Sequence, residues 1–285
     1  MTIRMIVTDL DGTLLNSANT ISDKNIQAFR KAIGMGIIPV VATGRIDSEA
    51  FFFARSIGAT DYLISGNGGV VKDYQNKKLI HQVDLEWSTV REFLDLFRGY
   101  DEIFCQAHTA LGCICTENTF PWMENAGWAK AYVKEFRDKQ IVVKDIEEYV
   151  AGKKIGISKF VLSSVNFSLL DEIMEKAGKL NGMEVLRPMD YCVECIPTGV
   201  DKGFGLIMLC EYLGIELEDV MVIGDSDNDK EMFEVHGPVK VAMGNAFDSI
   251  KELAAHIVSS NDEDGVAEAI EAIIFKTINN KEGKA

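Results

Sequence analysis

The chain has 285 residues, a length that allows one large domain or two moderate ones. Hydrophobic residues make up 47% and charged residues 26%, with five prolines, which excludes a disordered or collagen-like chain and predicts a globular protein with a buried core. The formal net charge of -15 disfavours binding to nucleic acid or to an anionic membrane surface, because such binding requires an excess of Lys and Arg.

The first part of the chain is predicted to alternate strands and helices. Residues 3–8, 37–42 and 62–65 have the apolar character of buried strands. Ser22 is placed to cap a helix that ends near Gly34 and carries Ile26, Phe29 and Ile33 on one face, and a second helix is expected at residues 47–57. The order strand, helix, strand, helix, strand is typical of a parallel sheet with right-handed crossovers.

From about residue 70 the pattern changes. Residues 70–82 predict a hairpin, and further strands are expected at 103–108, 113–116, 159–164, 183–188 and 191–197, with helices at 88–97 and 168–180. An aromatic and charged stretch between them contains Phe120, Trp122, Trp128 and Tyr132. We expect these side chains to be core rather than a substrate-facing surface. Neighbouring strands with helices to one side indicate an α+β domain.

After residue 197 the alternating pattern returns. Strands are expected at 220–223, 239–244 and 256–260, and helices at 203–214, 246–255 and 265–277, before a polar tail. The predicted fold class is therefore α/β. A Rossmann-like parallel-sheet core, made of residues 1–81 and 193–285, is interrupted by an inserted α+β domain at residues 82–192.

The cysteines and the lengths of the apolar segments indicate the cellular compartment of the protein. The spacings Cys113-x-Cys115 and Cys192-x-x-Cys195 raise the alternative of a zinc site, but both lie in strand-like stretches, so we expect all six cysteines to be buried, reduced thiols. The four histidines show no metal spacing and are expected to be structural. The apolar run at the N-terminus is too short for a secretion signal, and no later segment approaches the roughly 20 apolar residues of a membrane span. We therefore expect a cytoplasmic protein.

Polar residues follow the predicted parallel strands at their carboxyl ends. Asp9 and Asp11 follow the first strand, Thr43 the second, and Asn67 the third, while the cluster 225–229 follows the strand at 220–223. In an open parallel sheet, ligands bind outside the carboxyl ends of the strands. Their shared position predicts one site, which Lys202 would enter at the start of a helix.

Asp9 and Asp11 are expected to face the same site, because residues two apart in extended backbone point to one side. Asp225 would bring a third carboxylate there. Carboxylates this close do not all ionise unless a cation neutralises them or one keeps a proton. Because Mg²⁺ prefers one or two carboxylates together with water and substrate phosphate, the set predicts a magnesium site.

The remaining groups suit a phosphoryl ligand. Thr43 offers a hydroxyl donor and Lys202 a positive charge. Backbone N–H groups are available for a concave anion site at Leu10, Asp11 and Gly12. With phosphate held there, Asp9 is placed to attack phosphorus and form an aspartyl phosphate, and Asp11 to act as general acid and then as general base.

Four segments resemble, in order, the four motifs of the haloacid dehalogenase superfamily of phosphohydrolases. They are Asp9-Leu10-Asp11-Gly12-Thr13, Thr43-Gly44-Arg45, Lys202-Gly203 and Gly224-Asp225-Ser226-Asp227-Asn228-Asp229. The segment Ser65-Gly66-Asn67-Gly68-Gly69 and the insertion after it are similar to the Cof-like branch, class IIB, whose inserted domain is a C2-type cap.

The resemblance implies a role for each matching residue. Asp9 would be the nucleophile and Asp11 the acid/base, and Mg²⁺ would be bound by the Asp9 side chain, the Asp11 main-chain carbonyl and Asp225. The phosphate would be bound by Thr43, Gly44, Lys202 and Asn228, together with the backbone at Leu10 and Gly12, and Asp229 would position Lys202. Asp227 receives no role. Arg45 and Asn67 stay open between a substrate contact and, respectively, a surface ion pair and a turn.

These expectations describe a Mg²⁺-dependent phosphatase that acts on a small phosphorylated metabolite, such as a sugar phosphate or a phosphorylated cofactor. Substrate choice is expected to reside in the inserted domain, and the protein to be a monomer or a weak homo-oligomer. One alternative is a phosphomutase, which returns the phosphoryl group to another hydroxyl of the same substrate. Another is a receiver-like phospho-acceptor signalling protein, which the large insertion disfavours.

Overall fold

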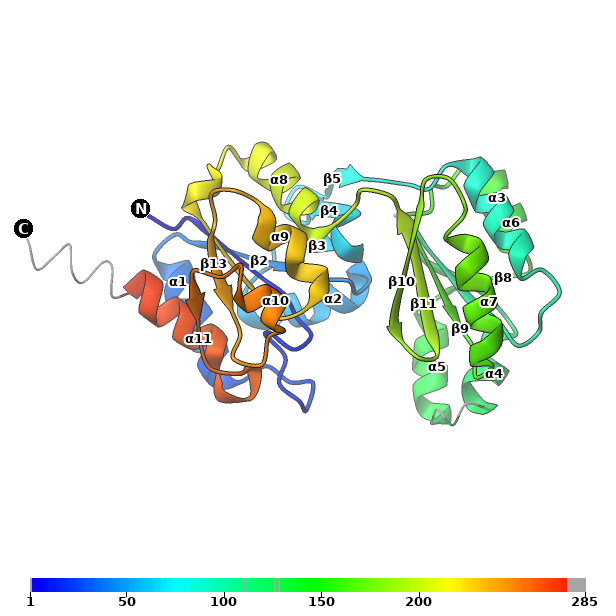
Figure 1. Ribbon diagram of the computed structural model, residues 1–285, viewed down its shortest axis with the longest axis horizontal. Helices are drawn as coiled ribbons and strands as arrows, with labels where there is room; N and C mark the ends of the chain where they lie inside the picture. The colour runs from blue at the N-terminus through cyan, green and yellow to red at the C-terminus, as the bar shows by residue number, and fades with distance from the viewer. Residues whose placement is uncertain (1, 110, 126, 128, 276–285) are drawn as a thin grey trace, which may run out of the picture. The chain divides into compact units, whose positions relative to one another are not determined.

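The chain folds into two units, seen in a computed structural model that describes residues 2–109, 111–125, 127 and 129–275 (Figure 1). The first unit comprises Met1–His81 and Asp201–Ala285, and the second unit comprises Gln82–Val200. The second boundary therefore lies beyond the expected residue 192. The reason is that strand β11 (Cys192–Pro197) pairs with two strands of the second unit, β9 and β10.

The first unit contains one eight-stranded sheet in the order β14-β13-β12-β1-β2-β3-β4-β5. The strands from β14 to β3 are parallel to one another, and β4, next to the edge strand β5, runs antiparallel to β3. The strand bounds are β1 Met5–Thr8, β2 Ile38–Ala42, β3 Tyr62–Ser65, β4 Val70–Asp73, β5 Lys78–Gln82, β12 Val220–Gly224, β13 Val239–Ala242 and β14 His256–Ile257.

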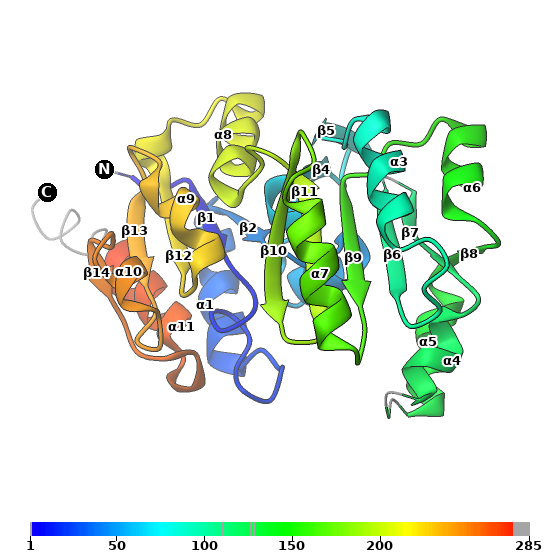
Figure 2. The same cartoon turned by 45° about the vertical axis from the view of Figure 1, so that its right-hand side comes forward.

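Helices cover both faces of this sheet, which is why its central strands are apolar along their whole length. Helix α1 packs against α11, and α8 packs against α9 on the opposite face (Figure 2). The helix bounds are α1 Asp23–Gly34, α2 Asp47–Ala54, α8 Lys202–Leu213, α9 Lys230–Glu234, α10 Asp248–Lys251 and α11 Gly265–Ile270. A 3-10 turn at Arg55–Ile57 follows α2, and a π-helical turn at Glu271–Phe275 follows α11. The last two residues of the helix expected at 265–277 lie outside the described range.

One detail of α1 differs from the expected pattern. Ser22 caps the helix, and its hydroxyl accepts the N–H of Asn25 at 3.1 Å. Ile33, however, is 38% exposed rather than part of the buried face. Asn25 is buried instead, because its side-chain oxygen accepts the N–H of Ala267 at the start of α11. The buried face of α1 therefore includes Asn25, which contacts α11, and leaves out Ile33, which apolar periodicity alone would place there.

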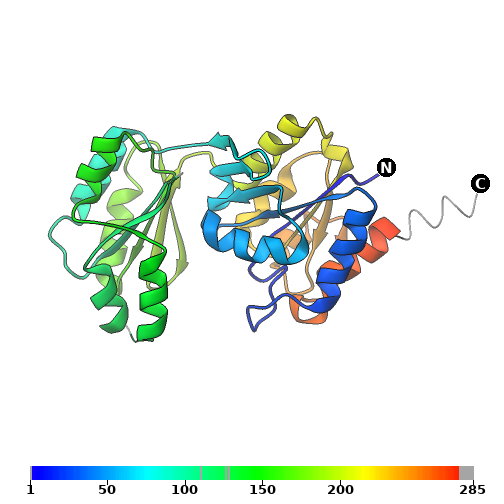
Figure 3. The same ribbon diagram turned by 180° about the vertical axis from the view of Figure 1, so that it is seen from behind.

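The second unit contains a six-stranded mixed sheet in the order β10-β11-β9-β6-β7-β8. Its elements are α3 Trp87–Leu96, β6 Phe104–Thr109, β7 Gly112–Thr116, α4 Thr119–Asn125, α5 Lys130–Asp138, β8 Ile141–Val143, α6 Ile146–Lys153, β9 Lys159–Ser163, α7 Phe167–Ala177, β10 Met183–Met189 and β11. Helices α3, α6 and α7 lie along one face of this sheet (Figure 3), and Phe93, Phe160 and Leu170 pack in the core between them. The predicted fold class, a parallel core with an inserted α+β domain, is confirmed.

The sequence pattern between β7 and β9 predicts no particular helix or strand. This stretch forms α4, α5, β8 and α6, none longer than nine residues. Phe120 is buried in a small cluster with Phe104, and Trp122 packs against that cluster, so both are core as expected. Trp128 and the side chain of Tyr132 lie outside the described residues.

All six cysteines are buried and unbridged, in agreement with the expected thiols. Within the part of the chain that the structure describes, no helix combines the length and the apolar composition needed to cross a bilayer.

Candidate active site

The predicted polar residues meet at the carboxyl edge of the sheet in the first unit. Asp9 directly follows β1, and Asp225 directly follows the neighbouring parallel strand β12. Lys202 is the first residue of α8, and Asp229 ends a 3-10 turn that precedes α9. Asp9 and Asp225 are far apart in the chain but lie close together in space, because parallel strands present their ends at the same edge of the sheet.

Lys202 lies between two carboxylates. Its side chain is fully buried, and its Nζ donates to Asp9 Oδ1 and to Asp229 Oδ1, each at 2.7 Å. Burial alone would lower the pKa of Lys202, but the charges of Asp229 and Asp9 raise it above its ordinary value. The lysine thus stays protonated and provides a fixed positive charge beside Asp9.

Asp9 itself is almost completely buried, with 2% of its surface exposed. Burial raises its pKa to about 8, and Lys202 opposes that rise while the charges of Asp229 and Asp225 add to it. The backbone N–H of Asp9 donates to the carbonyl of Ile223 in β12, so the end of β1 is fixed against the strand that supplies Asp225.

The pKa of Asp225 is also raised by burial, but less than that of Asp9. Burial raises its pKa to about 6, against the effect of the Thr13 hydroxyl, which donates to Asp225 Oδ1 at 2.6 Å. Asp229 is oriented by the backbone, since its Oδ2 accepts the N–H groups of Asp225 at 2.9 Å and Ser226 at 3.2 Å. A side chain at Gly224 would place Cβ 2.6 Å from the Asp229 carboxylate, so this approach requires glycine.

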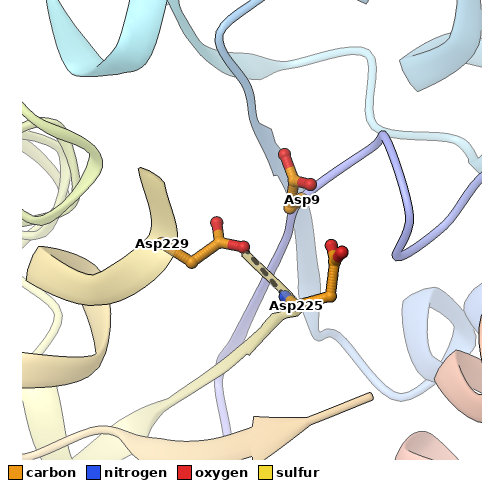
Figure 4. A group of neighbouring side chains, drawn as sticks. All are labelled: Asp9, Asp225 and Asp229. Atoms are coloured by element: carbon orange, nitrogen blue, oxygen red, sulfur yellow. Dashed lines mark hydrogen bonds between the residues drawn. The ribbon is translucent and has the colours of Figure 1, made fainter. Parts of the chain in front are cut away.

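The carboxylates of Asp9, Asp225 and Asp229 could hold a metal ion (Figure 4). One oxygen of each lies within 4.8 Å of the others. Among the described residues this is the one set of three Asp, Glu, His or Cys side chains so arranged. Three buried carboxylates face the single ammonium of Lys202, so the charge balance favours a bound cation. Because both oxygens of Asp229 are already bonded, Asp9 and Asp225 are the better ligands.

Asp11 is not part of this group of three carboxylates and forms an ion pair with Arg45. The guanidinium donates from Nε to Asp11 Oδ2 at 2.8 Å and from a terminal nitrogen to Oδ1 at 2.5 Å, which makes a bidentate ion pair. The hydrogen bond to Asp11 raises the pKa of Arg45, and Arg45 also lies over the ring of Phe53 at 5.0 Å. Of the two readings open for Arg45, the structure shows an ion pair, and its partner is the predicted acid/base residue.

Thr43, Gly44 and Asn67 follow strands β2 and β3 at the same edge of the sheet. Thr43 is fully buried, and its hydroxyl accepts the N–H of Arg45 at 3.1 Å. Gly44 has no room for a side chain, because a Cβ there would lie 2.7 Å from Asn67 Oδ1. Asn67 is buried and adopts the left-handed conformation with φ 55°, which is rare outside glycine.

Asn228 links Asn67 to Lys202 through hydrogen bonds. Its Oδ1 accepts from Lys202 Nζ at 3.2 Å, and its Nδ2 donates to Asn67 Oδ1 at 3.4 Å. Leu10 is fully buried, and its carbonyl accepts the N–H groups of Thr13 and Leu15, which closes a tight loop after β1. Gly12 lies in that loop with φ 78°, and a Cβ there would come within 2.4 Å of Asp225 Oδ2.

Two residues of this region carry no role in the sequence-based prediction. Thr13 orients Asp225, and Asn245, which follows β13, donates from its side chain to the carbonyl of Gly12 at 2.8 Å. Thr13 belongs to the first motif, and its hydroxyl could have been proposed as a partner for a nearby carboxylate. Asn245 has no local signal beyond being a polar residue after a strand.

Comparison with known proteins gives a consistent result. A family model described as haloacid dehalogenase-like hydrolase matches residues 6–270. The 5-amino-6-(5-phospho-D-ribitylamino)uracil phosphatase YcsE of Bacillus subtilis is 30% identical over 268 residues, which cover 94% of each chain.

Solved structures have the same arrangement of elements. A haloacid dehalogenase-like hydrolase from Bacteroides thetaiotaomicron superposes with a TM-score of 0.81 at 27% identity, covering 96% of this chain and all of that one. The HAD subclass IIB sugar phosphatase BT4131 has a TM-score of 0.72 at 20% identity, covering 94% of this chain and 98% of its own, a likeness of fold alone.

Proposed function

Because this chain belongs to the haloacid dehalogenase-like hydrolase family, in its Cof-like branch, we propose that it removes phosphate from a small metabolite through an aspartyl phosphate on Asp9. The chain is a phosphatase, and its inserted mixed sheet gives it the fold of subclass IIB members. The observation that carries the proposed chemistry is the burial of Asp9 against Lys202, one strand away from Asp225.

In the first step, a carboxylate oxygen of Asp9 attacks phosphorus, and the bond from phosphorus to the leaving oxygen breaks. Asp11, after its carboxyl separates from Arg45 and takes up a proton, donates that proton to this oxygen, so the product leaves as an alcohol. Asp11 is held by Arg45 and is half-exposed, so it lies near the site without being enclosed in it. In the second step, water attacks the aspartyl phosphate, Asp11 takes its proton, and inorganic phosphate and free Asp9 are formed.

Positive charge is needed where the phosphoryl oxygens lie, since phosphoryl transfer depends mainly on positioning and electrostatic stabilisation. Lys202 supplies one such charge, and Thr43 and Asn228 supply polar groups beside it. We assign Asp9, Asp225 and the main-chain carbonyl of Asp11 to Mg²⁺. When bound, this ion supplies charge against the phosphoryl oxygens and the two carboxylates.

The substrate is proposed to be a phosphorylated sugar, a phosphorylated polyol or a cofactor precursor that contains one. One relative is named as a phosphatase of a phosphoribityl compound, and a protein of the same fold is named as a sugar phosphatase. Since those substrates differ in the group that bears the phosphate, kinship alone does not select among them.

The test is a screen of phosphorylated sugars, polyols and 5-amino-6-(5-phospho-D-ribitylamino)uracil for phosphate release with and without Mg²⁺. Asp9→Asn is expected to abolish release. The matched control is Asp227→Asn, which removes an equal charge from an exposed residue whose carboxylate accepts a hydrogen bond from Ser249. Mass spectrometry should find one phosphoryl group on the peptide that contains Asp9. Equal release by wild type and Asp9→Asn would refute the proposal, and an isomerised sugar phosphate without free phosphate would indicate a mutase.

A further inference from the structure

The loop that carries Asp9 and Asp11 is held from outside by the last third of the chain. The side chain of Asn245 donates from Nδ2 to the carbonyl of Gly12 at 2.8 Å. Its Oδ1 accepts the backbone N–H of Asn261 at 2.9 Å. Because one end of the amide donates and the other accepts, only one orientation of the Asn245 side chain satisfies both partners.

Two neighbouring residues secure the next part of the same loop. Asn261 donates from its side chain to the carbonyl of Leu15 at 2.9 Å. The carboxylate of Asp262 accepts the N–H of Ser17 at 2.8 Å and its hydroxyl at 2.7 Å. We call Asn245, Asn261 and Asp262 the loop clamp. Its three members fix the loop at residues 12, 15 and 17, beyond the end of β1.

The position of this loop bears directly on the predicted metal ligands. The backbone at Gly12 lies so close to Asp225 that a Cβ would meet its carboxylate at 2.4 Å. The next residue, Thr13, bonds the other oxygen of Asp225. A shift of the loop at Gly12 would therefore change how Asp225 is placed relative to Asp9, and a misplacement of about 1 Å can reduce a rate about 100-fold.

We propose that Asn245 is a positioning residue for phosphoryl transfer, with Asn261 supporting it. By bonding the Gly12 carbonyl, Asn245 sets the spacing of Asp9 and Asp11 relative to Asp225. Asn245 is exposed, so its side chain contributes little to core packing, and its two hydrogen bonds are its main structural contribution. This role rests on the proposed function, because it concerns the residues assigned there to the reaction.

The test compares Asn245→Ala with Asn245→Asp. The aspartate keeps an oxygen for the N–H of Asn261 but loses the donor to Gly12, so it isolates the bond that matters. With para-nitrophenyl phosphate and saturating Mg²⁺, both variants are expected to lower kcat about 10-fold or more while KM stays within about twofold. Hydrogen exchange in residues 9–17 should become faster in both.

Two further variants make the comparison specific. Ser249→Ala removes an exposed hydrogen bond, to Asp227 at 3.2 Å, from the same edge of the first unit without touching the loop, and it should keep wild-type kcat. Asn261→Ala removes the bond to Leu15 but keeps the backbone N–H that Asn245 accepts, and about a threefold loss of kcat is expected. If Asn245→Ala does not fold, Asn245→Asp and Asn261→Ala still decide the question.

Wild-type kcat and unchanged exchange in residues 9–17 for the Asn245 variants would overturn the positioning role. So would a loss of kcat no larger than the unfolded fraction measured by circular dichroism. Asp9→Asn, assayed alongside, separates this result from failure of the proposed function. If Asp9→Asn released phosphate like wild type, the nucleophile assignment would fall, while hydrogen exchange would still show whether Asn245 holds the loop.

Discussion

The hydrogen bond from Thr13 to Asp225 allows the orientation of a buried carboxylate to be tested with a change of almost no volume. Thr13 is fully buried, and its hydroxyl donates to Asp225 Oδ1 at 2.6 Å. Thr13→Val replaces the hydroxyl with a methyl group of similar size and leaves the carboxylate without that donor. A hydrogen bond to a charged group contributes about 1.5–3 kcal/mol, so the free energy of unfolding should fall by about 2 kcal/mol.

Thr8 provides the matched control. It is also fully buried, but its hydroxyl donates to a neutral acceptor, the carbonyl of Asp9, at 2.9 Å. Thr8→Val should therefore lower the free energy of unfolding by only about 1 kcal/mol. Urea denaturation without added metal, followed by circular dichroism, measures both values.

The same pair of variants should differ more strongly in metal dependence. A group that orients a metal ligand changes metal affinity or activity about 10–100-fold when it is removed. The Mg²⁺ concentration for half-maximal phosphate release should rise by that factor in Thr13→Val and stay near the wild-type value in Thr8→Val. Equal losses of stability and equal Mg²⁺ midpoints in the two variants would contradict the inferred role of Thr13.

Three other changes probe buried ionisable groups. Lys202→Met leaves two buried carboxylates without their ion-pair partner, and loss of phosphate release is expected. The free energy of unfolding, measured by urea denaturation, should fall by about 3–5 kcal/mol. Near-native stability would argue against an ion triad of Lys202, Asp9 and Asp229. Burial keeps the pKa of His108 well below its ordinary value, so the unfolded chain takes up a proton below about pH 6.5 that the folded chain does not. Wild type should therefore lose stability relative to His108→Gln between pH 7 and 5.5, and parallel urea midpoints would refute this. Lys159→Met leaves the carboxylate of Glu194 without its ion-pair partner. The double variant Lys159→Met with Glu194→Gln should therefore be more stable than Lys159→Met alone. Strict additivity in a double-mutant cycle would show that the pair is not coupled.

The sheet of the first unit could be predicted from the sequence because its strands are short apolar runs between clear helix signals. Val7, for example, lies between Val40 and Val222 in the parallel register, and all three are fully buried. That topology alone brings the ends of β1 and β12 together. The proximity of Asp9 and Asp225 therefore follows from the order of strands and needs no knowledge of side-chain contacts.

The parts that could not be predicted depend on tertiary contacts. The bond from Asn245 to Gly12 joins residues 233 positions apart, and nothing in the local sequence marks Asn245 as a partner of that loop. The orientation of Asp11 toward Arg45 depends on a side-chain choice that the motif leaves open. In the second unit, α4 and α5 are too short for their periodicity to be decisive, and tertiary packing sets them.

The electrostatics of the site explain why like charges can lie at the end of a buried strand. Without a cation, burial raises the pKa of Asp9 to about 8 and that of Asp225 to about 6, so ionisation of either is unfavourable in the folded chain. The surrounding apolar sheet provides the stability that tolerates this cost, and Lys202 and Thr13 offset part of it. A ligand that brings positive charge relieves the rest only in the folded state, so binding and stability are coupled there. The same burial that makes the carboxylates costly also keeps water from competing for them, which is the condition under which a fixed charge stabilises a phosphoryl group most strongly.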